Sequence, residues 1–187
     1  MRKDPEELYF KGANRPVENV SWYDIMGNPT KNTEGFLAKI NRLTEGKRPE
    51  NYHYNLPTEA QWEYAARAKA SFEYSGSDKL KEVAWYDLNS HGETKEVGLK
   101  TPNGFGLYDT SGNVWEWCLD WRSEECYQEC FDKGIVVNPT GPKNGTYRVV
   151  RGGSWLDNPR DCRVAYRDND RPSNRSDIIG FRLVLSL

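Results

Sequence analysis

The sequence predicts an α+β fold with few short strands, two main helices and much irregular loop. Sixteen Gly and ten Pro, with a mean hydropathy of −0.89, indicate many turns and long irregular stretches. Seven Trp and eleven Tyr indicate at the same time that the chain is ordered around a core of large aromatic rings. Segments with helical spacing and segments with strand alternation both occur, which favours a mixed architecture.

Two segments are predicted to form the main helices. Apolar residues recur at helical spacing over 36–43, after Gly35, which predicts a helix of about three turns. Thr58 is placed to cap a second helix, and Gln61 is placed to return a hydrogen bond to the cap N–H. This capping pattern predicts a helix over 59–69.

Short strands are predicted around these helices. Residues 16–25 begin as a strand and end at a helix start, where Ser21 and Asp24 have the arrangement of a capping box. Strand-like pieces bounded by turn residues are predicted over 83–85, 96–99, 146–153 and 180–187. The last two alternate apolar with polar residues, which predicts strands with one buried face.

Two aromatic motifs have features of a sheet core. Trp115 and Trp117 flank Glu116, so in a strand both rings face one side and the carboxylate faces the other. Successive glycines at 152–153 suit a place where backbone segments approach closely, and Trp155 is expected to pack in the core.

Size and charge narrow the functional classes. At 187 residues and 21.6 kDa, the chain is predicted to be a single domain spanning 1–187. A formal net charge of −2 gives no general attraction to nucleic acid, so no nucleic-acid partner is expected. The chain has no apolar run of about 18 residues, and its start lacks the apolar region of a signal peptide, so the chain as given is expected to be soluble.

The four cysteines form no zinc-binding pattern. They stand at Cys118, Cys126, Cys130 and Cys162, without a CxxC motif, and both His lie far from them in sequence. Cys126 and Cys130 are four residues apart, which places them on one face of a helix. The two thiols either pair with each other or remain semi-buried free thiols. Gly-rich phosphate-binding loops are also absent from the sequence.

Five motifs occur in order within 17–184 and carry a family resemblance. They are NVSWYD, LPTEAQWEYAARA, NGFGLYDTSGNVWEW, RVVRGGSW and GFRLV. Together they resemble the formylglycine-generating-enzyme/sulfatase-modifying-factor domain over more than four-fifths of the chain. The resemblance implies a C-type lectin-like fold.

The resemblance also implies a structural Ca²⁺ site at the GNVWEW motif. The carboxylate of Glu116, with the backbone carbonyls of Gly112 and Val114, would line such a site with oxygen atoms, and Asn113 or Ser111 would be a further ligand. A salt bridge or a hydrogen-bonded turn at Glu116 is an equally open interpretation. A second calcium site of longer members is not expected, because the Asn-rich insertion before GLYD is missing.

The chain departs from the resemblance at the catalytic chemistry. Formylglycine-generating enzymes carry two Cys five residues apart after GGSW, which bind copper and activate oxygen. Here the first position is Asp157 and the second is Cys162, and a single thiolate cannot form the linear pair that Cu(I) favours. No His in the C-terminal half can activate Cys162, so this residue is expected to be packed and the chain not to be an enzyme.

The segment 156–179, within a C-terminal region spanning 148–187, is predicted to be a ligand-binding surface. Arginines form a frame at Arg163, Arg167, Arg171, Arg175 and Arg182. The proposed contact residues between them are Leu156, Asp157, Asn158, Asp161, Tyr166, Asp168, Asn169, Asp170, Asn174, Ser176, Asp177, Ile178 and Ile179. Short polar side chains with an occasional Tyr are typical of paratopes, although a solvated loop with Asx turns has the same composition.

This arrangement is similar to variable proteins that retroelements diversify, the treponemal variable protein in particular. In that family mutated template adenines change Asn-type codons into codons for many residue types. The resemblance implies a non-enzymatic protein with a diversified surface for a protein or glycan ligand. It also implies a lipoprotein at the cell surface or outer membrane, held by a lipid anchor outside this chain. The two rival functions are an oxidase of the formylglycine type using Cys162 and a Ca²⁺-dependent lectin.

Overall fold

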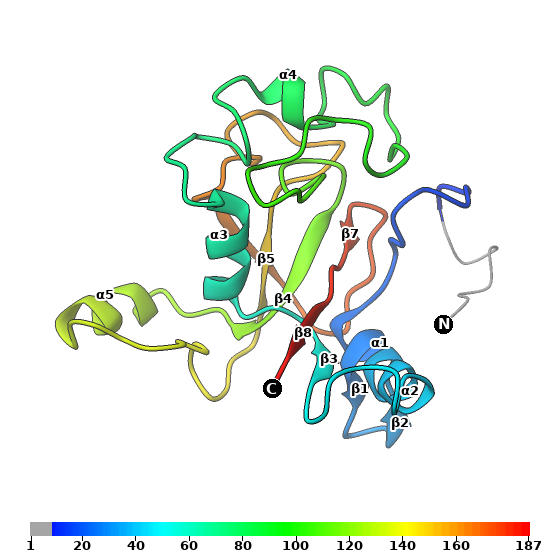
Figure 1. Ribbon diagram of the computed structural model, residues 1–187, viewed down its shortest axis with the longest axis vertical. Helices are drawn as coiled ribbons and strands as arrows, with labels where there is room; N and C mark the ends of the chain where they lie inside the picture. The colour runs from blue at the N-terminus through cyan, green and yellow to red at the C-terminus, as the bar shows by residue number, and fades with distance from the viewer. Residues whose placement is uncertain (1–8) are drawn as a thin grey trace.

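The computed structural model describes residues 9–187 and has the mixed α+β architecture expected (Figure 1). The first eight residues, on which the expectation about a signal peptide depends, lie outside the described part. The helices are α1 (Trp22–Met26), α2 (Phe36–Leu43), α3 (Glu59–Arg67), α4 (Leu80–Val83) and α5 (Cys126–Asp132). The strands are β1 (Gly27–Asn28), β2 (Thr33–Glu34), β3 (His53–Asn55), β4 (Trp115–Trp121), β5 (Arg148–Arg151), β6 (Arg167–Asp170), β7 (Ile179–Gly180) and β8 (Val184–Ser186).

A four-stranded sheet in the order β6-β5-β4-β7 forms the centre of the molecule. Strand β5 pairs antiparallel with both β4 and β6, whereas β4 pairs parallel with β7. The sheet therefore has β6 at one edge and β7 at the other. Two small antiparallel pairs, β1 with β2 and β3 with β8, lie outside this sheet.

The two faces of the central sheet bury different helices. On one face, Trp115 and Trp117 pack with Val150 and residues of α1 and α2. On the other face, Cys118 packs with Trp62 of α3. The side chains of β4 thus alternate between the faces, as its sequence predicts, and both tryptophans share one side.

The predicted helix caps are confirmed. Ser21 and Asp24 form a capping box at the start of α1, and Thr58 with Gln61 form another at the start of α3. The helix α2 has eight residues, about two turns rather than three. The amphipathic pattern predicted its existence, but its last apolar residue, Leu43, is 71% exposed and lies beyond the part that packs on the core.

Four strand predictions need correction. The start of the segment 16–25 forms no strand and makes only an isolated bridge, between Glu18 and Gly180. Residues 83–85 form the end of α4 and an irregular segment, because the apolar Val83 packs in a small cluster without a partner strand. Residues 96–99 form a turn, held where the Gly98 N–H donates to Asp109 at 2.8 Å. The segment 180–187 is split between β7 and β8, which belong to different sheets. Residues 146–153 do contain a strand, β5.

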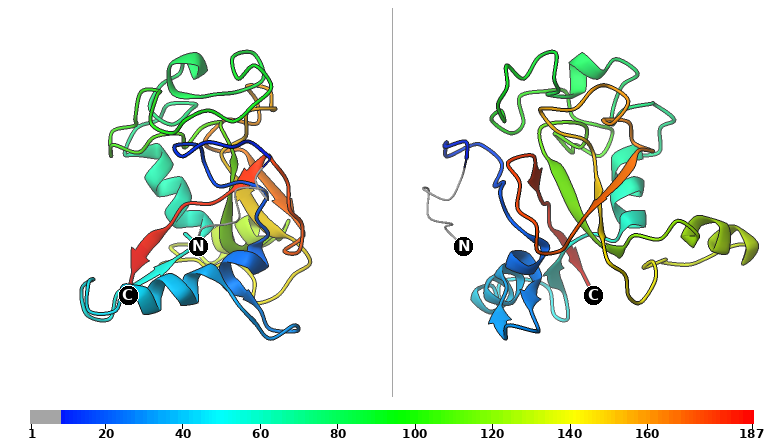
Figure 2. Two further views of the ribbon diagram at one scale, coloured as in Figure 1. Left: turned by 90° about the vertical axis from the view of Figure 1, so that its right-hand side faces the viewer. Right: turned by 180° about the vertical axis from the view of Figure 1, so that it is seen from behind.

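Long irregular segments cover the top of the sheet, and one arm projects from its side (Figures 1 and 2). The arm runs from β4 to β5 and carries α5. Buried amide side chains hold the irregular part: Asn113 both donates to and accepts from the backbone of Lys95. Within residues 9–187, no helix is long and apolar enough to span a membrane.

Candidate functional site

The C-terminal segment runs between the two edges of the central sheet. It leaves the sheet as β6, crosses 171–178 and returns as β7 on the opposite edge. The backbone between these strands is fixed, because the Asn19 N–H donates to the Ser176 carbonyl at 2.8 Å and the Trp115 N–H donates to the Ile178 carbonyl at 2.8 Å. The two strands and the last residues of the crossing are therefore held by the scaffold.

Six of the proposed contact residues form a connected series at the surface, which we call the polar strip. The polar strip consists of Asn158, Asp161, Tyr166, Asp168, Asp170 and Asn174. Asn158 donates to the Asp161 carboxylate at 2.6 Å, and Asn174 donates to the Asp170 carboxylate at 2.6 Å. Tyr166 connects the two ends, since Asp161 and Asp168 both lie close enough to act on its hydroxyl.

The ring of Tyr166 fixes the polar strip to the core. It lies 6.1 Å from the ring of Trp115, centroid to centroid, and Trp115 is buried in the main cluster. Partial burial raises the pKa of Tyr166, and the charge of Asp161 with its hydrogen bond to the hydroxyl raises it further. The phenol is therefore neutral near pH 7 and offers both a hydrogen-bonding group and apolar area.

The carboxylates of the polar strip have no cationic partner. Within residues 9–187, no lysine or arginine forms an ion pair with Asp161, Asp168 or Asp170. Asp168 and Asp170 instead accept hydrogen bonds from the following backbone N–H groups, at 2.8 and 2.7 Å. These local bonds orient the carboxylates but leave their negative charge uncompensated.

Two of the proposed contact residues do not share this surface. Ile179 is only 4% exposed, because it lies in β7 and packs in the main cluster, so the expectation that it points outward was wrong. Asn169 lies opposite Val149 in the sheet, on the α3 face, whereas Asp168 and Asp170 point to the other face. Alternation along β6 separates these neighbours.

The remaining proposed residues flank the polar strip. Leu156 is 59% exposed, while Asp157, Ser176, Asp177 and Ile178 are half-buried. The carboxylate of Asp157 accepts a hydrogen bond from the Ser154 hydroxyl. Burial raises the pKa of Asp157, and the nearby charge of Asp161 adds to this effect. Asp157 therefore lies beside the polar strip but is partly enclosed.

Most of the arginine frame anchors the segment as expected. Arg167 pairs with Glu59, Arg175 with Asp24 at 2.6 Å, and Arg182 with Glu116 at 2.5 Å. The guanidinium of Arg171 instead lies over the ring of Tyr147, and Arg163 donates to the Arg160 carbonyl. The three ion pairs connect different parts of the C-terminal region to α1, α3 and β4.

The position of the second catalytic cysteine is enclosed. Cys162 is fully buried among Tyr74, Leu80 and Val83, and burial raises the pKa of its thiol far above the usual range. A Cβ atom at Gly153 would lie 2.7 Å from the Cys162 sulfur, which shows how closely the glycine pair packs against it. The expectation of a packed residue is confirmed, and the thiolate needed for nucleophilic chemistry is strongly disfavoured.

The residues expected to bind Ca²⁺ have other partners. Both oxygens of Glu116 accept from Arg182, and one of them also accepts from the indole of Trp62 at 2.6 Å. The salt-bridge interpretation of Glu116 is therefore confirmed. Asn113 is bonded to Lys95, and the Ser111 hydroxyl donates to the Cys162 carbonyl, so both side chains already have partners in the fold.

A buried carboxylate that the sequence interpretation missed lies beside this position. Asp109 has one buried oxygen with no hydrogen-bond partner in the described part of the chain. Burial raises the pKa of Asp109, and the charge of Glu116 raises it further. Glu116 has about four lone-pair positions and uses three, so one remains on Oε1. Asp109 and Glu116 thus each keep an oxygen lone pair for a further partner, and the acidic residue three positions before Gly112 was the available signal.

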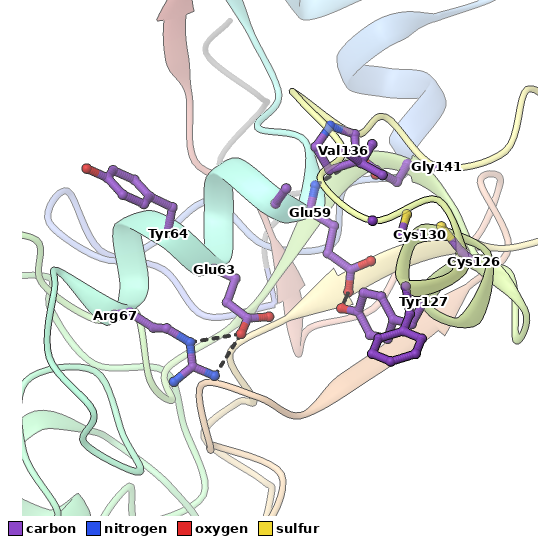
Figure 3. Close-up of a pocket in the computed structure, with 14 residues that line it drawn as sticks. Glu59, Glu63, Tyr64, Arg67, Cys126, Tyr127, Cys130, Val136 and Gly141 are labelled. Carbon is purple, nitrogen blue, oxygen red and sulfur yellow. Dashed lines mark hydrogen bonds and ion pairs between the residues drawn. The ribbon is translucent and has the colours of Figure 1, made fainter.

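A second charged site lies between α3 and the arm (Figure 3). It is a cavity of about 480 Å³ whose lining includes Glu59, Glu63, Cys126, Tyr127 and Cys130. Its two glutamates are compensated from within: Arg151, which has no exposed surface, donates to Glu59 at 2.8 Å and to Glu63 at 2.7 Å. The charges of this cavity therefore serve the fold.

The scaffold and its C-terminal segment define a class of protein: a C-type lectin-like α+β fold in which charged motifs fix the backbone and the last strands frame a polar surface. The sulfatase-modifying factor enzyme 1-like domain matches residues 2–187. The chain belongs to this family.

Relatives that are similar in sequence and solved structures that are similar in fold both support the family assignment. The chain is similar to the formylglycine-generating enzyme of Streptomyces coelicolor, with 39% identity over 90% of this chain and 52% of that protein. It is 32% identical to the chaperone protein LppX of Paenibacillus barcinonensis, over 84% of this chain and 65% of that protein. Among solved structures, Treponema denticola variable protein 1 has a TM-score of 0.75 and 30% identity, with 96% of this chain and 77% of that chain covered.

The family contains relatives with different names, and the match is partial for several of them. The chain spans about half the length of the formylglycine-generating enzymes it matches, 52% of the Streptomyces protein and 55% of that from Thermomonospora curvata. Family membership therefore establishes the fold and leaves the activity to be argued from this chain's own residues.

Proposed function

We propose that this chain is a non-enzymatic binding protein that uses the polar strip to contact a ligand. The observation that carries the proposal is the series of carboxylates at Asp161, Asp168 and Asp170, exposed or half-buried without an ion-pair partner in residues 9–187 and mounted on a fixed backbone. A surface of this kind offers charge and hydrogen bonds to a partner without rearrangement of the scaffold.

The chemistry of the polar strip defines the kind of ligand. Its uncompensated carboxylates favour a protein or glycan surface that presents ammonium, guanidinium or other hydrogen-bond donors. Tyr166 adds rigid contact area at a low entropy cost, as aromatic side chains do in paratopes. Binding should therefore weaken as the salt concentration rises, because charges at the rim of an interface are screened.

The resemblance to variable proteins adds that the polar strip differs among copies of the chain. The strand β6 that carries Asp168 and Asp170 is held by its pairing with β5, so side-chain changes at these two positions leave the backbone pairing in place. Reading the neighbouring DNA for a reverse transcriptase and for a near-repeat of the 3′ end tests this part of the proposal. Neither feature should be found if the chain is not diversified.

A pair of displayed libraries tests the binding surface itself. In the first library the six positions of the polar strip are randomised, and in the matched control six enclosed positions are randomised: Val149, Arg151, Cys162, Val164, Ile179 and Gly180. Most members of the first library should remain folded, measured by resistance to protease, and selection against a chosen acidic or basic protein should yield binders. Most members of the control library should be unfolded.

Two outcomes of this experiment would contradict the proposal. Loss of folding in the polar-strip library, at the frequency seen in the control, would show that these side chains are structural. A folded library from which no binder emerges against any of several target proteins would show that the surface does not support recognition.

The alternative function is an oxidase of the formylglycine type, which the similarity to formylglycine-generating enzymes favours. The wild-type chain should consume no oxygen with copper and a cysteine-containing peptide, because position 157 is Asp and Cys162 is enclosed. The variant Asp157→Cys recreates the two-thiol pattern and serves as the matched comparison. Copper-dependent oxidation of the peptide by the wild type would establish the alternative.

We also propose that Asp109 and Glu116 hold a structural Ca²⁺ ion together with the backbone carbonyls of Gly112 and Val114. Calcium should raise the unfolding midpoint and chelation should lower it, since an ion that binds only the folded chain stabilises it. Asp109→Asn should remove this response, and the exposed Glu96→Gln should preserve it. An unfolding midpoint of the wild type that changes with neither calcium nor chelator would contradict the proposal. Sugar binding that chelation abolishes would instead favour a lectin.

A further inference from the structure

Two thiols on the arm are accessible, unlike the other two cysteines. Cys126 and Cys130 are half-buried and free, and both line the cavity between α3 and the arm. Cys118 and Cys162 have no exposed surface, and burial raises the pKa of both thiols. Burial and the neighbouring Cys130 also raise the pKa of the Cys126 thiol, so what distinguishes the two cysteines of the arm is that solvent can reach them.

The two sulfur atoms lie on the same side of α5 (Figure 3). Cys126 begins the helix and Cys130 follows one turn later. Residues four apart on a helix have Cβ atoms about 5–6 Å apart, whereas a disulfide requires about 3.5–4.5 Å. A direct S–S bond would therefore distort α5. A metal ion placed between the sulfurs forms one bond to each of them and needs no direct S–S contact, which removes this conflict.

We propose that Cys126 and Cys130 form a binding site for one soft, two-coordinate metal ion, of which Cu(I) is the physiological example. On binding, each thiol loses its proton to solvent and each sulfur forms one bond to the ion, so that two protons are released for each Cu(I) bound. The ion keeps its oxidation state. The site lies on α5, apart from the position of Asp157 and Cys162, which belongs to the enclosed part of the C-terminal region.

The small number of possible ligands around Cys126 and Cys130 favours a metal ion that needs only two. In the described residues no group of three or more His, Cys, Asp or Glu side chains is arranged to hold a metal ion. A structural zinc site needs about four such ligands, whereas a thiolate pair suffices for Cu(I). The bound pair of thiolates carries negative charge. Near Cys126 the guanidinium of Arg167 favours that charge and its ion-pair partner Glu59 opposes it, so these neighbours neither create nor exclude the site.

Competition with a coloured Cu(I) chelator tests the site. The full chain, reduced and kept free of oxygen, is titrated into the Cu(I)–bicinchoninate complex, and copper withdrawn from the chelator is read from its absorbance. The wild type should withdraw about one Cu(I) per chain. Cys126→Ser and Cys130→Ser should each weaken withdrawal strongly, and the double variant should abolish it. Gln128→Ser, which introduces the same residue type on the same helix, should behave as the wild type.

Three further measurements keep the result independent of folding defects in the variants. Circular dichroism establishes that each variant is folded before its titration. In the wild type, Cu(I) should protect Cys126 and Cys130 from alkylation, detected by mass spectrometry, and X-ray absorption should show two sulfur neighbours. The proposal is overturned if the wild type withdraws no copper, if the folded double variant withdraws as much as the wild type, or if Cu(I) leaves both cysteines open to alkylation.

Discussion

The charged side chains on the two faces of strand β6 differ in their partners. On the α3 face, Arg167 donates to the buried carboxylate of Glu59 at 2.6 Å and joins a network that includes Arg151. On the other face, Asp168 accepts only a local backbone hydrogen bond and has no ion pair. One strand of four residues thus separates charges that hold the fold together from charges that are free to meet a ligand.

The difference teaches which polar residues of the chain are structural. Buried charges require partners, because an isolated buried ion costs several kcal/mol. Arg151 meets this requirement through Glu59, Glu63 and the Val164 carbonyl. Surface carboxylates have no such requirement, because water solvates them, and they therefore stay available to a ligand at little cost to the fold. The comparison predicts large effects of substitution on one face and small effects on the other.

The largest expected effect follows removal of the network's centre. Arg151→Met should lower the free energy of unfolding by about 3–5 kcal/mol, because Glu59 and Glu63 lose a buried partner. Chemical denaturation measures the change. Arg42→Met is the matched control, since Arg42 forms an exposed pair with Glu34 and its loss should leave the unfolding midpoint almost unchanged. Equal effects of the two substitutions would remove the distinction between the regions.

A pH effect of intermediate size is expected at Asp120. This side chain is 5% exposed, and burial raises its pKa to about 6 from 3.8, while the Glu59 N–H donates to it at 2.8 Å. The folded state therefore holds the proton more tightly than the unfolded state, so stability falls as pH rises from about 4 to about 6.

Asp120→Asn should remove this loss of stability. Near pH 4 the variant should have the same free energy of unfolding as the wild type. Above pH 6 its free energy of unfolding should be higher by at most about 3 kcal/mol, because each pKa unit corresponds to about 1.4 kcal/mol. Denaturant titrations across this pH range measure the difference. A difference that is constant with pH would show that Asp120 does not titrate in this window.

The smallest effect is expected in the polar strip. Replacing Asp168, Asp170 and Asn174 together by Ala should keep the melting temperature within a few degrees of the wild type, since exposed substitutions change stability by about 0.5 kcal/mol or less each. Arg167→Ala, on the opposite face of the same strand, should lower it clearly more. Calorimetry ranks the two variants, and the reverse order would mean that the polar strip is part of the framework.

Local chemistry explains what was predictable about the fold. The capping boxes at Ser21 and Thr58 depend only on neighbouring residues, and both are present. The alternation of Trp115, Glu116 and Trp117 likewise depends only on strand geometry. By contrast, residues 83–85 and 96–99 resemble strands locally, but a strand needs a partner, and the fold brings none to them.

The candidate site was predictable as a segment but not side chain by side chain. Ile179 differs little from Ile178 in sequence, yet its strand β7 places it in the core. Asn169 was assigned to the same surface as Asp168 because the boundaries of a short edge strand are not visible in composition. The pairing of Arg151 with Glu59 joins residues 92 positions apart, which no local pattern encodes.

The pairing of β6 and β7 with opposite edges of one sheet has a consequence for how this surface can change. The crossing from 171 to 178 has a fixed distance to cover, and its last residues are tied to Asn19 and Trp115 by backbone hydrogen bonds. An added or deleted residue would shift these bonds out of register at one end or the other. New specificities should therefore arise by exchange of side chains at constant length, unlike antibody loops, which also vary in length.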